Sequence, residues 1–269
     1  MTAVLEIAGG ALAFGDRTLW SGLDLAIQPG EFVAVLGPNG SGKTSLLKAI
    51  LGQQPLSSGS MRLAGDAVRR GDRRVGYIPQ QKLLPAGTAM RGRDLVTFGV
   101  NGHRFGLPVS RAADRQRVDE LLADVGATGY ASRPVGSLSG GEQQRLRIGQ
   151  ALAGEPVLLL CDEPLLSLDL AHQRGVSELI DRRRRTHDTA VVFVTHDVNP
   201  VLDVVDRILY LAGGEFRQGT PDEVLRSDVL TELYGTPVDV IRSRGRVIVV
   251  GVPDDHSHHD HVHHEDGAE

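Results

Sequence analysis

The stretch Gly37-Pro38-Asn39-Gly40-Ser41-Gly42-Lys43-Thr44 decides the fold of this chain. It fits the pattern G-x-x-x-x-G-K-[ST], in which glycines let backbone N–H groups approach the phosphates of a nucleotide. The apolar residues 32–36 before it predict a strand, and residues 45–51 after it predict a helix whose N-terminal dipole favours an anion. We expect Lys43 to reach the β- and γ-phosphates and the Thr44 hydroxyl to bind Mg²⁺.

A second set of candidate functional residues follows the apolar run Leu158-Leu159-Leu160-Cys161. This run predicts a buried strand. The strand ends in Asp162 and Glu163. A carboxylate at the C-terminal end of a strand beside a phosphate loop can hold Mg²⁺, and the next one suits a base for the attacking water. The alternative is two solvated acids at a strand end, which the apolar run before them and Pro164 after them make the weaker interpretation.

Strand and helix patterns alternate through most of the chain. The strand before Asp162 covers residues 157–161, and another buried-type strand is predicted at residues 190–195. Helices are predicted at residues 141–153 and 171–185. This alternation predicts an α/β fold with a parallel sheet covered on both faces. Short alternating apolar patterns in residues 1–30 and 60–78 are more typical of antiparallel strands, and the polar helical stretch between residues 84 and 138 indicates an inserted helical subdomain.

The C-terminal part has two different patterns. Residues 238–241 and 247–250 flank a turn that contains Gly245, which predicts a β-hairpin. From Pro253 onward the chain is rich in histidine and acids with almost no apolar residues, so we expect disorder there. Six of the ten histidines lie in this tail: His256, His258, His259, His261, His263 and His264. Neutral imidazoles can bind Zn²⁺, and an incidental low-complexity tail or a purification tag is the alternative.

Composition narrows the class of protein. The chain has 269 residues, 41% hydrophobic and 23% charged, which is ordinary for a globular protein of one domain or slightly more. A net charge of −5 argues against a nucleic-acid binder that depends on bulk positive charge, and the basic run at residues 182–185 suits a solvated helix end. Cys161 is the single cysteine, which fits a reducing cytoplasm. No run approaches the roughly 18 apolar residues that span a bilayer, and we expect no signal peptide.

Leu138-Ser139-Gly140-Gly141-Glu142-Gln143-Gln144-Arg145 is a second motif, and its sequence LSGGEQQR resembles the signature of ATP-binding-cassette ATPases. With the phosphate loop and the Asp162–Glu163 pair in the family's order, residues 1 to about 220 resemble an ABC transporter ATPase subunit. The resemblance implies a P-loop NTPase, RecA-like α/β core with an antiparallel β-subdomain and an inserted α-helical subdomain at about 84–140. Residues 221–252 would form a C-terminal helix and β-hairpin extension, and 253–269 the tail.

The resemblance also assigns functional residues. Glu163, His196, Lys43 and Gln80 are expected to be catalytic, with Gln81 as an alternative to Gln80. Mg²⁺ would be held by Thr44, Gln80 and Asp162. The residues expected to contact ATP, some of them on a second chain, are Phe14, Gly37, Pro38, Asn39, Gly40, Ser41, Gly42, Lys43, Thr44, Ser45, Ser139, Gly140, Gly141 and Asp169. Phe14 would stack on adenine, although it could equally be a core residue.

Partners and cargo follow from the same resemblance. The signature faces ATP bound to another cassette in this family, so we expect a homodimer at the cytoplasmic face of the membrane. A separate transmembrane permease and an extracytoplasmic solute-binding protein would complete the system. Residues 219–225 and 233–235 resemble the C-terminal region of zinc and manganese importer ATPases. A siderophore or iron-complex importer, and a soluble ABC ATPase without a membrane partner, remain as alternatives.

Overall fold

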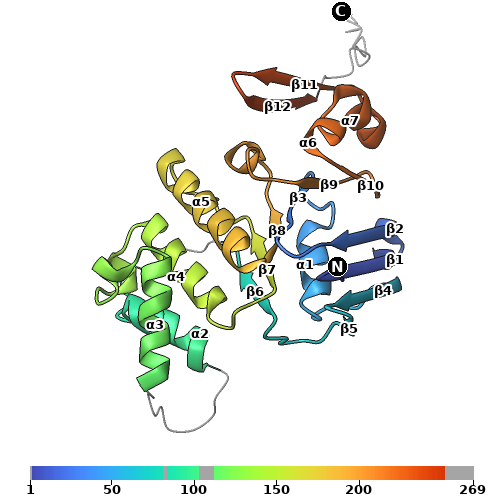
Figure 1. The fold of residues 1–269 in the computed structure, drawn as a ribbon. Helices are drawn as coiled ribbons and strands as arrows, with labels where there is room; N and C mark the ends of the chain where they lie inside the picture. The colour runs from blue at the N-terminus through green and yellow to red at the C-terminus, as the bar shows by residue number, and fades with distance from the viewer. Residues whose placement is uncertain (1, 81–83, 86, 103–111, 252–269) are drawn as a thin grey trace, which may run out of the picture.

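A six-stranded sheet forms the centre of the molecule (Figure 1). The computed structural model describes residues 2–80, 84–85, 87–102 and 112–251. The strand order is β10-β9-β3-β8-β7-β6, and all neighbours are parallel except β10 and β9. The strands are β3 (Phe32–Leu36), β6 (Val75–Ile78), β7 (Leu158–Asp162), β8 (Ala190–Val194), β9 (Arg207–Ala212) and β10 (Glu215–Gly219). Every residue of β3, β7 and β8 is buried, because both faces of the sheet are covered.

Side-chain alternation divides the interior into two apolar clusters. Val33 and Val35 of β3 join the cluster that contains helix α1 (Lys43–Ile50). Phe32 and Ala34 point to the other face, where they join the cluster that contains helix α5 (Leu170–His187). Because side chains of a strand alternate between faces, a single apolar strand can support both layers.

A second, antiparallel sheet packs on the α1 side of the molecule (Figure 1). Its order is β2-β1-β4-β5, formed by β1 (Leu5–Phe14), β2 (Arg17–Ile27), β4 (Ser58–Leu63) and β5 (Asp66–Ala67). Trp20, Leu23 and Ile27 of β2 are fully buried between this sheet and the central sheet. The antiparallel strands expected in residues 1–30 are therefore present.

Three helices form a separate group beyond β6 and α5 (Figure 1). These are α2 (Gly92–Asn101), α3 (Ala112–Asp124) and α4 (Gly140–Leu152), with 3-10 turns at Thr128–Tyr130 and Val135–Ser137. Leu95, Leu121 and Leu146 bring the three helices together in one cluster. α4 also contacts β6 and α5, so this group is fixed to the edge of the central sheet.

The C-terminal region packs across the end of β9 (Figure 1). It consists of a 3-10 turn at Asn199–Val201, which precedes β9, and of α6 (Pro221–Val224), α7 (Ser227–Tyr234), β11 (Val238–Ser243) and β12 (Arg246–Gly251) after β10. β11 and β12 pair as the expected hairpin. Its two-residue turn has φ of 49° at Arg244 and 74° at Gly245, which is the type I′ pattern that suits the twist of a hairpin.

One prediction about the strands was wrong. Residues 75–78, grouped in the sequence with antiparallel strands, form β6, which pairs parallel to β7 at the edge of the central sheet. The segment has only four residues, of which Val75 and Tyr77 are half-buried. Such a short apolar pattern does not show whether the strand pairs parallel or antiparallel. The parallel α/β core itself is as expected. Within the described ranges, no helix is both long and apolar enough to cross a membrane.

Candidate active site

The loop between β3 and α1 forms a cradle that only glycine can build. Gly37 has a φ of 140°, and a Cβ there would lie 2.0 Å from the carbonyl oxygen of Leu211. Gly42 has a φ of 101° and ends the loop at the N-terminus of α1, where a Cβ would lie 2.9 Å from Trp20 Nε1. The side-chain oxygen of Ser41 is buried and has no hydrogen-bond partner. The loop therefore offers a close approach to backbone N–H groups, as a phosphate site requires.

Lys43 is held at the bottom of this cradle. Its side chain is 6% exposed, and Nζ donates hydrogen bonds to the carbonyl oxygens of Gly37 at 2.7 Å and Pro38 at 3.0 Å. Burial lowers the pKa of Lys43, while the carboxylates of Glu163 and Asp162 act in the opposite direction. An ammonium group with two neutral partners in a buried site is ready to exchange them for phosphate oxygens.

Asp162 lies at the end of β7 and is 5% exposed. Burial raises the pKa of its carboxyl group, and the neighbouring Glu163 raises it further. The Tyr77 hydroxyl donates to Asp162 Oδ2 at 3.4 Å, and burial followed by the charge of Asp162 raises the pKa of Tyr77 to about 12. Tyr77 was not among the residues predicted from the sequence, because only the pairing of β6 with β7 places it here.

Glu163 has a backbone conformation that is rare for its residue type. Its φ is 46°, and its N–H donates to the carbonyl oxygen of Val194 at 3.0 Å. A left-handed backbone at a residue with a Cβ costs about 1–2 kcal/mol and is concentrated at functional sites. Gln80 Nε2 donates to Glu163 Oε2 at 3.2 Å, and His196 Nδ1 lies 3.8 Å from the same oxygen. Gln80 and His196, which come from two other segments, thus both lie close to the carboxylate of Glu163.

A cavity of ≈ 420 Å³ joins Gln80 and Glu163 to Lys43 and the rest of the phosphate loop. Its predicted lining residues are Phe14, Asn39, Gly40, Gly42, Lys43, Thr44, Ser45, Gln80 and Glu163. Phe14 is exposed at the end of β1, so it is available to a ligand and is not a core residue. Arg17 also lines the cavity and donates from Nη2 to the carbonyl oxygen of Gly40 at 3.2 Å. No sequence motif indicated Arg17, which follows a two-residue turn in an ordinary hairpin.

The signature segment lies elsewhere on the chain. Ser139 caps α4: its Oγ accepts a hydrogen bond from Glu142 N–H at 3.2 Å, and its own N–H donates to Glu142 Oε2 at 2.8 Å. This is the reciprocal capping box that stabilises a helix start. A Cβ at Gly141 would lie 2.1 Å from His172 Cδ2, so α5 approaches the signature closely.

Asp169 caps α5 beside the signature. Its Oδ1 accepts from His172 N–H at 2.9 Å, and Oδ2 lies 2.7 Å from His172 Nδ1. The backbone hydrogen bond from His172 lowers the pKa of Asp169, with the side-chain contact as the next cause. Neither Asp169 nor Ser139, Gly140 and Gly141 line the cavity at the phosphate loop. The described structure therefore divides the predicted ATP-contacting residues into two separate groups.

The two predicted metal sites differ in how much of each the structure describes. The histidines of the tail and Gln81 lie outside the described residues. Among the residues that are described, no group of three or more His, Cys, Asp and Glu side chains could hold a metal ion. The residues predicted to hold Mg²⁺ carry suitable donor atoms. The Thr44 hydroxyl and the Gln80 amide line the cavity, and Asp162 is a buried carboxylate whose charge acts on Lys43. These are the oxygen donors that Mg²⁺ prefers, completed by phosphate and water.

Comparison with known proteins decides the family. The ABC transporter family model matches residues 20–166, which include the phosphate loop, the signature and the carboxylate pair. The chain belongs to the ABC transporter ATP-binding family. It is therefore an ATPase, which binds ATP and hydrolyses it.

Individual relatives extend this result. The zinc import ATP-binding protein ZnuC of Pseudomonas fluorescens (strain Pf0-1) is 32% identical over 261 residues, which cover 97% of this chain and 89% of the relative. The Fe(3+) ions import ATP-binding protein FbpC of Streptomyces avermitilis is 40% identical over 228 residues, 83% of this chain and 64% of the relative. Among solved structures, a chain from an ABC transporter assigned to the metal-chelate type, in an inward-facing conformation, has a TM-score of 0.77 and 28% identity. It covers 93% of this chain and 97% of its own length. The fold of this ATPase is thus that of the cassettes, a P-loop NTPase.

Proposed function

We propose that this ATPase powers an importer of a divalent metal ion, zinc or manganese. The observation that supports this cargo is the extent of the similarity. The zinc import relative aligns over 97% of the chain, whereas the iron import relative, although more identical, aligns over 83%. The motifs of the ATPase core are common to both, so identity there says little about cargo. The longer alignment takes in more than the core, as expected if the C-terminal α6–β12 region belongs to the metal-import branch.

The residues at the cavity, with the neighbouring His196 and Asp162, have distinct proposed roles in hydrolysis. Lys43 and the N–H groups of the loop would hold the β- and γ-phosphates. Glu163 would orient and deprotonate the attacking water, and His196 would hold the γ-phosphate. When bound, Mg²⁺ neutralises charge on the phosphates, with Thr44, Gln80 and Asp162 as the residues that would hold it. Phe14 would pack on the adenine ring.

We also propose that the complete site forms between two copies of the chain. Ser139, Gly140 and Gly141 lie at the start of α4, away from the cavity, and Ser139 is exposed. Two copies arranged head to tail would bring this segment to the γ-phosphate held by the partner, with Asp169 linking the two sites. The dimer would act on a separate transmembrane permease at the cytoplasmic face of the membrane, in a system with an extracytoplasmic solute-binding protein. No nucleic acid is involved in this proposal.

The histidine-rich tail would bind Zn²⁺ through His256, His258, His259, His261, His263 and His264. Its nitrogens compete with protons, so zinc binding should weaken as the pH falls through roughly 6.5. Removal of the residues after Val252 should abolish most zinc binding in calorimetry and leave ATP turnover of the isolated protein unchanged. Equal zinc binding by the truncated and the full-length protein would contradict this role.

An importer of iron or of an iron complex is the second candidate, and the 40% identity to the iron import relative favours it. The test is uptake of radioactive zinc, manganese and ferric siderophore by cells that lack this chain, with wild type and Glu163→Gln restored in parallel. The proposal predicts loss of zinc or manganese uptake, recovered only by wild type. Loss confined to the iron complex would establish the second candidate, and unchanged uptake of all three would contradict both candidates.

A further inference from the structure

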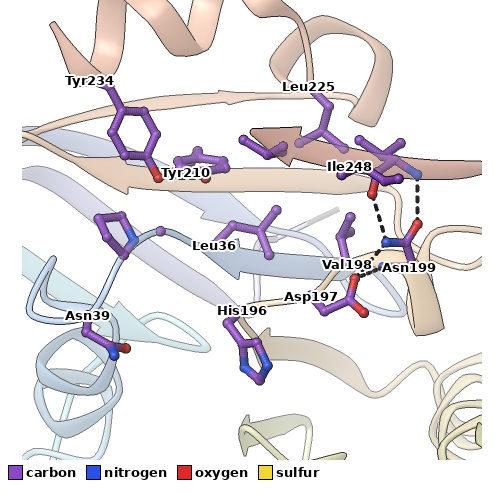
Figure 2. A pocket seen from close by; sticks show the side chains of 14 residues that line it. Leu36, Asn39, His196, Asp197, Val198, Asn199, Tyr210, Leu225, Tyr234 and Ile248 are labelled. Carbon is purple, nitrogen blue, oxygen red and sulfur yellow. Dashed lines mark hydrogen bonds between the residues drawn. The ribbon is translucent and has the colours of Figure 1, made fainter. Parts of the chain in front are cut away.

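We infer that Asn199 is a positioning residue for ATP hydrolysis, which fixes the loop of His196 by fastening it to the C-terminal hairpin. The inference rests on the proposed role of His196. Both parts line one cavity of ≈ 530 Å³, and they meet at Asn199 (Figure 2). His196, Asp197 and Asn199 line this cavity from the loop, and residues 247–249 of β12 line it from the hairpin.

The contact between Asn199 and the hairpin has the geometry of a strand pair. Asn199 Nδ2 donates to the carbonyl oxygen of Val247 at 2.8 Å, and the N–H of Val247 donates to Asn199 Oδ1 at 2.8 Å (Figure 2). In the hairpin register Val247 faces Arg242, one step beyond the Ser243–Arg246 pair that closes the turn. Narrow and wide pairs alternate in an antiparallel ladder, so both backbone groups of Val247 point outward from β11. A single amide side chain satisfies both.

Asn199 is linked equally closely to the residue next to His196. Oδ1 of Asp197 accepts from the Asn199 N–H at 2.9 Å and from Nδ2 at 2.7 Å. On the other flank, Thr195 Oγ1 donates to the carbonyl oxygen of Asp197 at 2.8 Å, and Thr195 N–H donates to Val35 O at 3.2 Å. The backbone on both sides of His196 is therefore anchored, once to the central sheet and once to the hairpin.

The imidazole itself has no comparable support. The side chain of His196 is 59% exposed, and its Nδ1 lies 3.8 Å from Glu163 Oε2, which is beyond hydrogen-bond range. Figure 2 shows the ring pointing away from the hairpin. Its position is thus set by the anchored backbone, and a small displacement of that backbone would misplace a group that must meet the γ-phosphate.

The hairpin is itself rigidly held, so it can serve as the anchor. Thr231 Oγ1 of α7 accepts from Val238 N–H at 3.0 Å, and Ser227 Oγ accepts from Val240 N–H at 2.9 Å. α7 is fixed in turn to the central sheet, because the hydroxyls of Tyr234 and Tyr210 lie 2.9 Å apart. The C-terminal region is consequently part of the support of the catalytic loop.

The test compares steady-state ATP turnover of the full-length protein and four single variants. Asn199→Ala removes the contact from the loop side, and Val247→Pro removes one of its bonds from the hairpin side. Val249→Pro is the control for proline in this strand, since it lies two positions along, on the same side of the ladder, and removes no bond to Asn199. Val247 is 5% exposed and Val249 is 40% exposed, so a fall in melting temperature identifies any loss of packing in Val247→Pro. His196→Ala measures the role on which the inference depends. Melting temperature and ATP KM show whether each variant folds and binds nucleotide.

We expect Asn199→Ala and Val247→Pro each to lower kcat about tenfold while KM changes by less than about twofold, because misplacement affects the reaction more than binding. A variant that carries both Asn199→Ala and Val247→Pro should be no slower than the slower of these two single variants, and Val249→Pro should resemble wild type. If kcat is unchanged in Asn199→Ala but reduced in His196→Ala, the inference about Asn199 is overturned and the proposed role of His196 stands. An equal loss in Val249→Pro would overturn it too, because the hairpin in general would then be responsible. An unimpaired His196→Ala would remove the proposed role of His196 and the inference with it.

Discussion

The cavity at the phosphate loop and the signature segment at the start of α4 are built in opposite ways. At and beside the cavity, Lys43 and Asp162 are almost fully buried, and burial shifts the pKa of each toward its neutral form. Glu163 has a left-handed backbone there. At the signature, Ser139 and Glu142 satisfy each other in a capping box near the surface. The first region holds charges and strain that ATP and Mg²⁺ can relieve, whereas the second is locally stable and open to a partner.

Glu163→Gln should have the largest effect on turnover. Loss of a general base costs about 10²–10⁴-fold, while an amide keeps the size of the side chain and its contact with Gln80. ATP should remain bound, and a closed dimer should accumulate. Turnover assays and sedimentation in ATP check this, with Lys43→Ala as the contrasting variant that weakens nucleotide binding. Near-normal hydrolysis in Glu163→Gln would remove Glu163 from its role.

Ser139→Arg should come next, with turnover reduced by roughly 10²-fold, the scale of one lost group that stabilises transition-state charge. The variant places bulk and charge where the γ-phosphate on a partner would lie. The monomer should still bind ATP through its own phosphate loop, because Ser139 does not line that cavity. Equilibrium binding of a fluorescent ATP analogue and sedimentation separate the two steps. Weak ATP binding by the monomer would place the signature at the chain's own site.

Asp162→Asn should have the smallest of the three effects. It should raise the free energy of unfolding, whereas the other two variants lower turnover. The raised pKa of Asp162 means that the folded state disfavours the charged form, so the penalty is fully present at neutral pH and disappears as the pH falls toward 3.8. The variant should be more stable by about 1 kcal/mol at pH 7, the usual gain from relieving a functional site, and the difference should vanish in acid. Chemical denaturation across pH checks this in the absence of Mg²⁺. A less stable variant at pH 7 would contradict the assignment of a buried, unfavourable charge.

The sequence predicted the parts of the molecule that depend on local pattern. The phosphate loop, the strand that ends in Asp162 and Glu163, and the C-terminal hairpin follow from glycine spacing, apolar runs and turn residues. The contacts of Tyr77, Arg17 and Asn199 could not be predicted, because each depends on which segments lie side by side. Tyr77 reaches Asp162 only through the parallel pairing of β6, and Asn199 meets a backbone 48 residues away.

Mixing two inactive variants tests the shared site most directly. Lys43→Ala removes the phosphate contact from one chain, and Ser139→Arg damages the signature of the other. In the mixed dimer one site combines an intact loop with an intact signature. The introduced arginine faces only the loop that carries Lys43→Ala, where ATP binding is already weakened. A chain with both changes, mixed with wild type, is the control, since its mixed dimers contain no intact site.

We predict that equal amounts of the two single variants regain about a quarter of wild-type turnover, since half of the dimers are mixed and each has one of two sites. The control mixture should show only the activity of its wild-type dimers. Failure of the single variants to recover any hydrolysis, under conditions where sedimentation shows mixed dimers, would contradict a site shared between two chains.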